Sequence, residues 1–396
     1  MPEENHNLRI AFVQDALPFV GGAEKVLAAA LEVFPQASIY TLVHNRKALL
    51  GTVFAHQKIH TSFIDRLPAA HKEHRTYLPL FPFAVEQFDL RGYDLILSFS
   101  YAAAHGILPR PDQLHISFIY TPLRYAWHYY HQYLHESGLH FGLKALLVKL
   151  ILHYLRLWDQ AAASRVDRFV AISQWVARCI WRAYRRPAQV IYPPVEIQKF
   201  LPLYPRDEYY IAVSRLVQHK QLAMIVDVFS RLNLPLIVIG DGPERSRLIK
   251  LAAPNVKLLG RQPDETVQRL LGRAKACVHA AEEDFGITLV EAQAAGCPVI
   301  AFGKGGALET VEDEKTGLLF QEQSVESLAG AIEKFESGRL RFSIADLQAN
   351  ASRFDTAIFK RKIAALVARE WKRFKCDGEG YASLAEERFS NSDPFQ

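Results

Sequence analysis

One stretch, ACVHAAEEDFGITLVEAQAAGCPVIAF (residues 276–302), decides the fold class. Its apolar run Ala276–His279 predicts a buried strand, Ile287–Ala295 a helix and Pro298–Ala301 a second strand. Two strands joined through a helix pair in parallel, because the helix returns the chain to the other end of the sheet. The stretch therefore predicts one repeating unit of a parallel sheet covered by helices.

The same alternation runs through the rest of the chain. Further strands are predicted at Leu8–Val13, Ser38–Val43, Asp94–Ser98, His115–Ile119, Arg168–Ile172, Gln189–Tyr192, Tyr209–Val213, Leu236–Ile239, Val256–Leu258 and Gly317–Phe320. Between them, helices are predicted at Ala23–Phe34, Lys220–Leu232, Glu244–Leu251, Asp264–Arg273 and Ser324–Lys334.

A segment with four prolines, residues 192–208, divides the pattern and predicts a linker. We therefore expect an α/β protein with two Rossmann-like parallel-sheet domains, residues 1–195 and 196–355, that face an interdomain cleft. A helix over 356–375 is expected to pack back on the first domain, and a polar tail follows over 376–396.

Composition excludes several classes of protein. With 49% hydrophobic and 22% charged residues among 396, the chain is neither disordered, collagen-like nor a coiled coil. Four cysteines without a CxxC pair argue against a disulfide framework or a structural zinc site and favour a reducing, cytoplasmic setting. The acidic, polar start is unlike a signal peptide, and no apolar run is long enough to span a membrane.

Charge is unevenly distributed. Residues 1–195 hold 20 Lys/Arg against 14 Asp/Glu, a net +6, whereas residues 196–396 hold 27 against 28, a net −1. The first half therefore suggests an anionic partner. Within it, residues 141–158 predict a helix with a broad apolar face and several cations. Such a helix either lies on an anionic membrane or packs into the core with its cations in solvent.

Candidate functional residues follow predicted strands. Arg215 and Lys220 stand five apart at a strand end, where they could grip a diphosphate or simply be solvated cations on a turn. Glu283 and Glu291 flank a helix start whose backbone N–H groups, those of Gly286, Ile287 and Thr288, can hold a phosphate. The carboxylates can accept hydrogen bonds from sugar hydroxyls, or they can serve only to charge the helix start.

Other candidates are weaker on their own. Arg261 follows a strand and can stack on a base. Gly21 and Gly22 allow a loop to approach a ligand closely. An aromatic and cationic group suited to sugar faces and phosphates lies in the first half: His105, Tyr120, Arg124, Trp127 and His128.

Together these loops resemble family 4 of the retaining glycosyltransferases, which have the GT-B fold. The matching motifs are GGAEK (21–25), SRLVQHK (214–220), GDGPE (240–244), EDFGITLVE (283–291), GCPVIAFGKGGALETV (296–311) and TGLLF (316–320). The stretch TPLRYAWHYYHQYL (121–134) is similar to a subgroup of bacterial mannosyltransferases. Departures from that subgroup at His105, Tyr120 and His128 lie on the acceptor side.

The resemblance implies roles for these residues. Arg215 and Lys220 would hold the diphosphate of a nucleotide-sugar donor and stabilise the leaving nucleotide. Glu283 would bind hydroxyls of the transferred sugar, and Glu291 would bind the ribose. Gly21, Gly22, Arg261 and the amides of residues 286–288 complete the expected donor site. No DxD triplet is present, so neither a metal nor a cofactor is expected.

The expected activity is retaining transfer of a hexose, with mannose from GDP-mannose favoured, to a glycan or lipid-linked glycan in cell-surface polysaccharide or lipopolysaccharide synthesis. A UDP-sugar donor, a GT-B sugar epimerase and a non-enzymatic GT-B binding module are the alternatives. The expected location is cytoplasmic, with peripheral contact to the membrane, and no nucleic-acid partner is expected.

Overall fold

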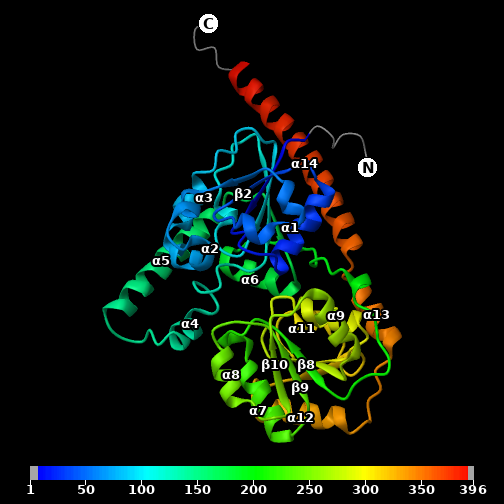
Figure 1. The fold of residues 1–396 in the computed structure, drawn as a ribbon. Coiled ribbons are helices and arrows are strands. Elements are labelled where there is room, and N and C mark those ends of the chain that lie inside the picture. Colours follow the sequence, from blue (N-terminus) through cyan, green and yellow to red (C-terminus); the bar gives the residue numbers. More distant parts are fainter. Residues whose placement is uncertain (1–7, 391–396) are drawn as a thin grey trace. The chain divides into compact units, whose positions relative to one another are not determined.

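The computed structural model describes residues 8–390, with side chains through residue 376. The chain divides into two compact units (Figure 1). Unit 1 comprises residues up to 171, 176–191 and those from 360 onward; unit 2 comprises 172–175 and 192–359. The first seven residues, which carry the expected polar start, and residues 391–396 lie outside the described part.

Unit 1 is built on a seven-stranded parallel sheet in the order β3-β2-β1-β4-β5-β6-β7. Its strands are β1 Ile10–Gln14, β2 Ser38–Thr41, β3 Ile59–Thr61, β4 Leu95–Ser100, β5 Leu114–Ile119, β6 Arg168–Ala171 and β7 Ala188–Val190. Its helices are α1 Gly22–Val33, α2 Ala70–Glu73, α3 Phe81–Glu86, α4 Tyr130–Glu136, α5 Leu143–Ala163, α6 Gln174–Tyr184 and part of α14 Thr356–Ser390, with a short turn, η6, at Ala104–Gly106.

Unit 2 repeats the design with six parallel strands in the order β10-β9-β8-β11-β12-β13. The strands are β8 Tyr210–Val213, β9 Leu236–Ile239, β10 Val256–Gly260, β11 Ala276–His279, β12 Val299–Phe302 and β13 Gly317–Phe320. The helical elements are η8 Gln218–Lys220, α7 Leu222–Leu232, α8 Arg245–Leu251, α9 Asp264–Arg273, α10 Ile287–Ala294, α11 Ala307–Thr310, α12 Val325–Glu336 and α13 Ile344–Ser352.

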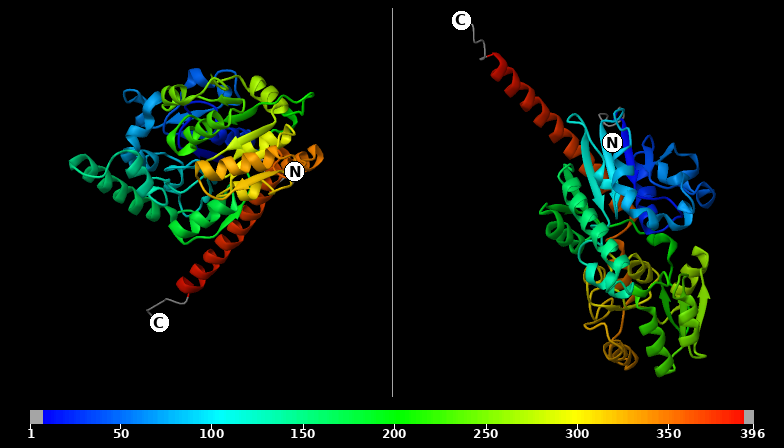
Figure 2. Two further views of the ribbon diagram at one scale, coloured as in Figure 1. Left: turned by 90° about the horizontal axis from the view of Figure 1, so that it is seen from below. Right: turned by 90° about the vertical axis from the view of Figure 1, so that its left-hand side faces the viewer.

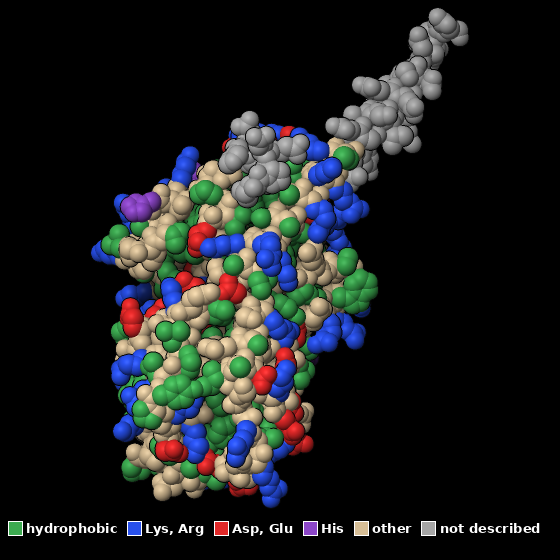
Figure 3. All heavy atoms as spheres, turned by 90° about the vertical axis from the view of Figure 1, so that its right-hand side faces the viewer, with side chains coloured by type: hydrophobic (Ala, Val, Ile, Leu, Met, Phe, Trp, Pro, Cys, Tyr) green, Lys and Arg blue, Asp and Glu red, His purple; other side chains and the backbone are tan. Residues whose placement is uncertain are grey.

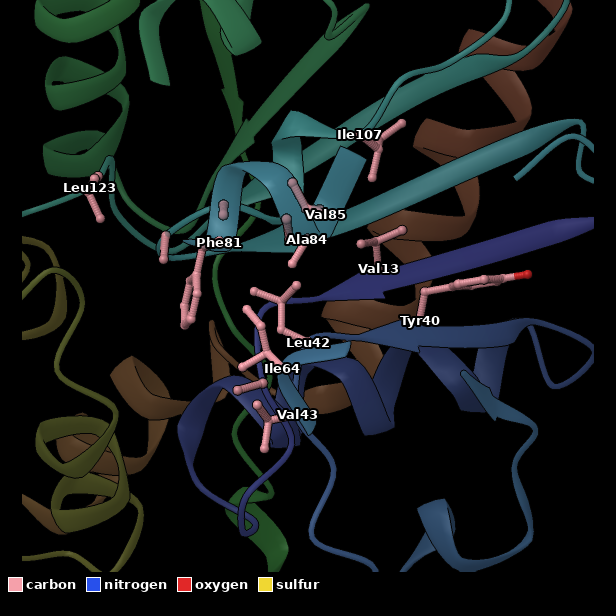
Figure 4. Close-up of a cluster of buried hydrophobic side chains, with 14 of the residues drawn as sticks. Val13, Tyr40, Leu42, Val43, Ile64, Phe81, Ala84, Val85, Ile107 and Leu123 are labelled. Atoms are coloured by element: carbon pink, nitrogen blue, oxygen red, sulfur yellow. The ribbon is translucent and has the colours of Figure 1, made fainter. Parts of the chain in front are cut away.

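Each sheet is buried on both faces, as parallel sheets require. In β8, Tyr210 and Ala212 join the apolar cluster of unit 2, while Ile211 between them points to the other face and is equally buried. The cluster of unit 1 gathers side chains from strand ends, loops and α3, among them Val13, Phe81 and Ile107 (Figure 4). The two-domain parallel α/β architecture predicted from the sequence is confirmed.

Strand order places the functional loops. In both sheets the order reverses beside the first strand, between β1 and β4 in unit 1 and between β8 and β11 in unit 2. Loops that leave the carboxyl ends of two such strands diverge to opposite faces, and the space between them is where ligands bind in open α/β sheets. The loops after β8 and β11 are those that carry Lys220 and Glu283.

Several boundaries differ from the prediction. The expected tail does not begin at residue 376, because the backbone of α14 stays helical to Ser390. The units divide near residue 191, and 172–175 belong with the second unit. Strand β3 was not predicted, because its three residues include polar His60 and Thr61 and are too short to show a period.

Helix α14 packs on unit 1 through its Lys360–Ile363–Leu366–Val367 side, where the last three are buried. Arg168 of β6 donates to Glu370 at 2.6 Å, and Arg369 donates to Gln189 of the neighbouring segment at 2.6 Å. The exposed side of the helix carries six cations: Arg361, Lys362, Arg369, Lys372, Arg373 and Lys375. Figure 3 shows Lys and Arg side chains gathered along this helix. The excess positive charge of unit 1 thus continues onto this helix.

Candidate functional site

The loop after β8 is held in place by two glycines of the neighbouring loop. A Cβ on Gly240 would lie 1.8 Å from the carbonyl oxygen of Ser214, and one on Gly242 would lie 2.4 Å from that of Leu216. Both glycines also have positive φ, at 142° and 156°. The GDGPE motif is therefore needed for close packing, and it supports the backbone that carries exposed Arg215.

Lys220 lies at the end of this loop, in η8 and not in the long helix as predicted. The left-handed residue Gln221, with φ 55°, separates η8 from α7, which begins at Leu222. After this break, the Lys220 side chain forms an ion pair with Glu283, which lies in the loop after β11.

Glu283 is the centre of a small charge cluster. Its Oε1 atom accepts from Lys220 and shares a hydrogen bond with Nε2 of His279 at 2.6 Å. The side chains of Lys220 and Glu283 are only 13% and 15% exposed. Burial alone would raise the pKa of Glu283, but the Lys220 ammonium and the hydrogen bond with His279 hold that pKa well below its usual range. The carboxylate is therefore ionised and fixed in direction.

A glycine-rich loop after β12 supports the Glu283 backbone. Gly305 has φ 67°, and its Cβ would lie 2.2 Å from the Glu283 carbonyl oxygen. Gly306 donates its N–H to the same oxygen at 2.7 Å. Beside them, Lys304 pairs with Glu282 at 2.8 Å. The loop thus fixes the backbone on either side of the charge cluster.

Helix α10 begins immediately after the loop that follows β11 and carries Glu283. Gly286 caps it with φ 87°, a conformation that other residues rarely adopt, and Ile287 and Thr288 form its first turn. First-turn N–H groups lack intrahelical partners and favour anions. Half-buried Glu291 lies just over one turn further along. The structure therefore places residues 286–288 directly beside Glu283, as the sequence suggested.

Arg261 is not part of this cluster. It is exposed and follows β10, the edge strand, two strands away from β8. Among residues 8–376, no hydrogen bond or ion pair joins Arg261 to Lys220 or Glu283.

In unit 1, the corresponding loops are linked by Asp15, which the sequence analysis did not identify. Asp15 follows β1, is fully buried, and accepts four backbone N–H groups from residues 101–104 at 2.6–2.9 Å. It therefore joins the loop after β1 to the loop after β4. A polar residue after an apolar strand was its only signal in the sequence.

Gly21 caps α1, and its N–H is accepted by Glu24 at 2.9 Å. Tyr120 is also part of this region, because its hydroxyl donates to the carbonyl of Ala23 at 2.8 Å. Gly22 is the exposed first residue of the helix. The two glycines and Tyr120 therefore lie together at the start of α1.

His105 is a core residue, and Trp127 is half-buried against the core of unit 1. His105 is 1% exposed; its Nδ1 lies 3.1 Å from Ser100 Oγ and its Nε2 lies 3.2 Å from Asp159 Oδ1. Trp127 donates to Asp159 Oδ2 at 2.6 Å, as does Tyr184 at 2.9 Å. Asp159 of α5 is thus a buried junction, and sequence reasoning missed it because it stands in a run of apolar residues.

Arg124 and His128 remain accessible. Arg124 lies over the ring of Tyr129 at 4.9 Å, and the ring of exposed His128 lies 4.8 Å from the same tyrosine. Of the five residues expected on the acceptor side, His128 is exposed, Arg124 and Trp127 are half-buried, and His105 and Tyr120 are buried. In the part of the chain with described side chains, no group of three or more His, Cys, Asp or Glu is placed to hold a metal ion.

Residues 195–353 match the family model of glycosyl transferases group 1. The match spans β8 to α13, and so includes the Lys220–Glu283–His279 cluster. Unit 2 is therefore similar in sequence to these transferases.

Two curated relatives are similar to part of this chain. A GDP-mannose-dependent monoacylated alpha-(1-6)-phosphatidylinositol monomannoside mannosyltransferase of Corynebacterium glutamicum is 29% identical over 42% of this chain and 52% of its own. The D-rhamnosyltransferase WbpZ of Pseudomonas aeruginosa is 32% identical over 39% of this chain and 46% of its own. The chain thus spans about half the length of the curated relatives it matches.

Solved structures match over almost the whole chain. HepE of Anabaena in complex with UDP-glucose has a TM-score of 0.67 at 21% identity, covering 92% of this chain and 100% of that one. Sucrose-phosphate synthase of Thermosynechococcus elongatus has a TM-score of 0.70 at 17% identity, covering 93% and 100%. The chain has the GT-B fold of these glycosyltransferases.

Proposed function

We propose that the protein is a retaining glycosyltransferase that uses a nucleoside diphosphate sugar. The observation that carries this proposal is the buried Lys220–Glu283 pair at the point where the strand order of unit 2 reverses. There a cation for phosphate, a fixed carboxylate for sugar hydroxyls and a glycine-capped helix start converge. The group 1 match over the same residues supports it.

Each group has a role in the proposed reaction. Cleavage of the anomeric bond increases negative charge on the leaving diphosphate, and Arg215 and Lys220 would stabilise that charge. Glu283 keeps one oxygen on Lys220 and His279, and its other oxygen would accept from the transferred sugar. For retention we propose front-face attack, in which the leaving phosphate takes the acceptor's proton.

We favour mannose from GDP-mannose as the donor, because the curated relatives include GDP-mannose-dependent mannosyltransferases. The competing UDP-sugar donor is supported by the fold match to HepE, which was solved with UDP-glucose. The loops around the charge cluster contain no feature that selects between the two bases.

The proposed acceptor is a glycan or lipid-linked glycan of the cell surface, as in lipopolysaccharide synthesis. Arg124 and His128 are the residues we propose to contact it, since they remain accessible in unit 1. A cytoplasmic position at the membrane surface completes the proposal, supported by the wide spacing of the four cysteines and the lack of a CxxC pair in the sequence.

Ligand-induced thermal shifts with GDP, UDP, ADP and their sugars test the donor. A shift with GDP and GDP-mannose alone would support the favoured donor, and a shift with UDP-sugars alone would replace it. Lack of any shift would contradict the enzyme assignment.

Substitution tests the mechanism. The double variant Arg215→Ala/Lys220→Ala should lose at least 100-fold in transfer, roughly the effect of removing preorganised charge stabilisation. Lys250→Ala, an exposed cation of α8, is the matched control and should leave transfer unchanged. Unchanged transfer in the double variant would exclude the mechanism, and inverted anomeric configuration in the product would exclude retention.

A further inference from the structure

Helix α5 leaves a long apolar surface uncovered. Leu143 is 83% exposed, and Leu147, Leu150 and Leu157 are each 56–57% exposed. Phe141, just before the helix, is 96% exposed. The first half of the helix projects away from the sheet of unit 1 in two different views (Figures 1 and 2). The core-packed alternative for residues 141–158 is therefore wrong for this half.

The exposed residues form one continuous stripe. Leu143, Leu147, Leu150, Tyr154 and Leu157 follow one another at alternating intervals of four and three residues, which places them on one side of a helix. We call these five residues the α5 stripe. Its length is about 21 Å at 1.5 Å per residue. The opposite side holds the helix to unit 1 through its buried residues Ala145, Leu152, Leu155, Asp159, Ala162 and Ala163.

All charged residues in the segment that carries the α5 stripe are positive. Residues 137–158 contain no Asp or Glu. Lys144 is exposed, and Lys149 reaches the carbonyl of His140 at 3.3 Å. The third cation, Arg156, is held against unit 1 by the Ala126 carbonyl at 2.7 Å. Two lysines therefore lie close to the projecting leucines without a neighbouring carboxylate in this segment.

These features decide which partner fits the surface. A second copy of the helix would bring Lys144 and Lys149 against like charges, and the α5 stripe spans only two heptads where coiled coils need about three or four. An anionic lipid surface offers negative headgroups for the lysines and acyl chains for the leucines. Among the described residues no helix is long and apolar enough to cross a membrane, so α5 would lie in the interface.

We propose that α5 docks unit 1 on an anionic bilayer, with the α5 stripe inserted at the boundary of headgroups and acyl chains. Lys144 and Lys149 contact lipid phosphates, and Phe141 enters beside Leu143. Docking rests on the membrane-surface position in the proposed function. It depends neither on the donor nor on the reaction, so failure of vesicle binding would leave the proposed transfer reaction unaffected.

Vesicle flotation of the full chain tests the proposal. The protein should float with vesicles of phosphatidylcholine containing 30% phosphatidylglycerol at low salt, and much less with pure phosphatidylcholine. Leu147→Glu/Leu150→Glu should reduce the partition coefficient at least tenfold, since it places carboxylates in the inserted stripe. Lys144→Gln/Lys149→Gln should reduce it roughly 25-fold on anionic vesicles, about fivefold per lysine.

Ile249→Glu, on an exposed apolar residue of α8 in unit 2, is the matched control and should float like the unchanged protein. Both Glu variants replace exposed side chains, so circular dichroism and thermal unfolding should be unchanged. Absence of flotation on anionic vesicles at low salt would overturn the proposal. So would equal flotation on neutral vesicles, or a dimer in light scattering that Leu147→Glu/Leu150→Glu abolishes without any vesicle binding.

Discussion

At the scale of single residues, the stability of unit 2 should depend on pH through Glu283. Its pKa is lowered in the folded state, so the Lys220 contact stabilises the fold above the unfolded pKa of about 4.5 and is lost as pH falls further. Lys220→Met should cost about 2 kcal/mol at pH 7, because one buried partner of the carboxylate is removed while His279 remains. Denaturation from pH 7 to about pH 2.5 measures it, and the difference in stability between Lys220→Met and the unchanged protein should narrow below about pH 4.5.

Lys250→Met is the matched control, because it removes an exposed lysine of the same unit and should change stability by less than about 0.5 kcal/mol. A cost for Lys220→Met that stays constant down to about pH 2.5 would show that Glu283 does not carry the effect.

His279 should matter for donor binding. When Lys220 also contacts a phosphate, His279 is the second group that holds Glu283, at 2.6 Å. His279→Asn would remove that imidazole contact and hold the carboxylate less firmly, so the affinity for the donor sugar nucleotide should fall about tenfold, or about 1.4 kcal/mol. Titration calorimetry measures it, with exposed His56→Asn as control. Equal donor affinity in His279→Asn and His56→Asn would show that His279 does not contribute to donor binding.

The sequence indicated Lys220 and Glu283 separately but not the contact between them. They are 63 residues apart, and only the neighbouring position of β8 and β11 in the sheet brings them together. His279 gave no signal because it ends a buried strand, where a histidine also fits as a core residue. Asp159 was hidden likewise by the apolar residues around it.

At the scale of elements, the glycine-rich loop should tolerate no side chain where it supports Glu283. Gly305→Ala combines a positive φ with a contact of 2.2 Å to backbone, and should cost about 2–3 kcal/mol. Gly330→Ala is the control, because Gly330 is inside α12 with open space around it and alanine should stabilise the helix by about 0.5–1 kcal/mol. Thermal unfolding of both variants gives the comparison, and opposite signs are expected; equal stability would contradict the packing role of Gly305.

Most strands could be predicted because buried parallel strands are short, continuous apolar runs bounded by turn residues. Helix α5 shows the limit of prediction from apolar patterns. Its periodic pattern predicts a helix, but the same leucines would suit a core or a lipid surface equally well. Only the fold shows that Leu152 and Leu155 face unit 1 while Leu147 and Leu150 do not.

At the scale of the whole molecule, α14 should stabilise unit 1 selectively. Leu366 is 2% exposed on its buried side, and Leu366→Ala should cost about 2–4 kcal/mol. Hydrogen exchange should then increase in β6 and β7, which contact α14 through Arg168 and Gln189, and stay constant in the strands of unit 2. Leu308→Ala, on an exposed leucine of α11, should change neither unit. Faster hydrogen exchange in unit 2 alone would contradict the prediction that α14 stabilises unit 1.

The order of segments along the chain has a consequence for synthesis on the ribosome. Unit 2 occupies residues 192–359, between the body of unit 1 and the helix that completes it. At about 5–20 residues per second, unit 1 waits on the order of 10–30 s for residues 360–367 after its last strand has been made. During that interval the apolar surface that will receive Ile363, Leu366 and Val367 is uncovered. The domain that is translated first is therefore the one that finishes folding last, and the nascent chain is most open to chaperones on that surface.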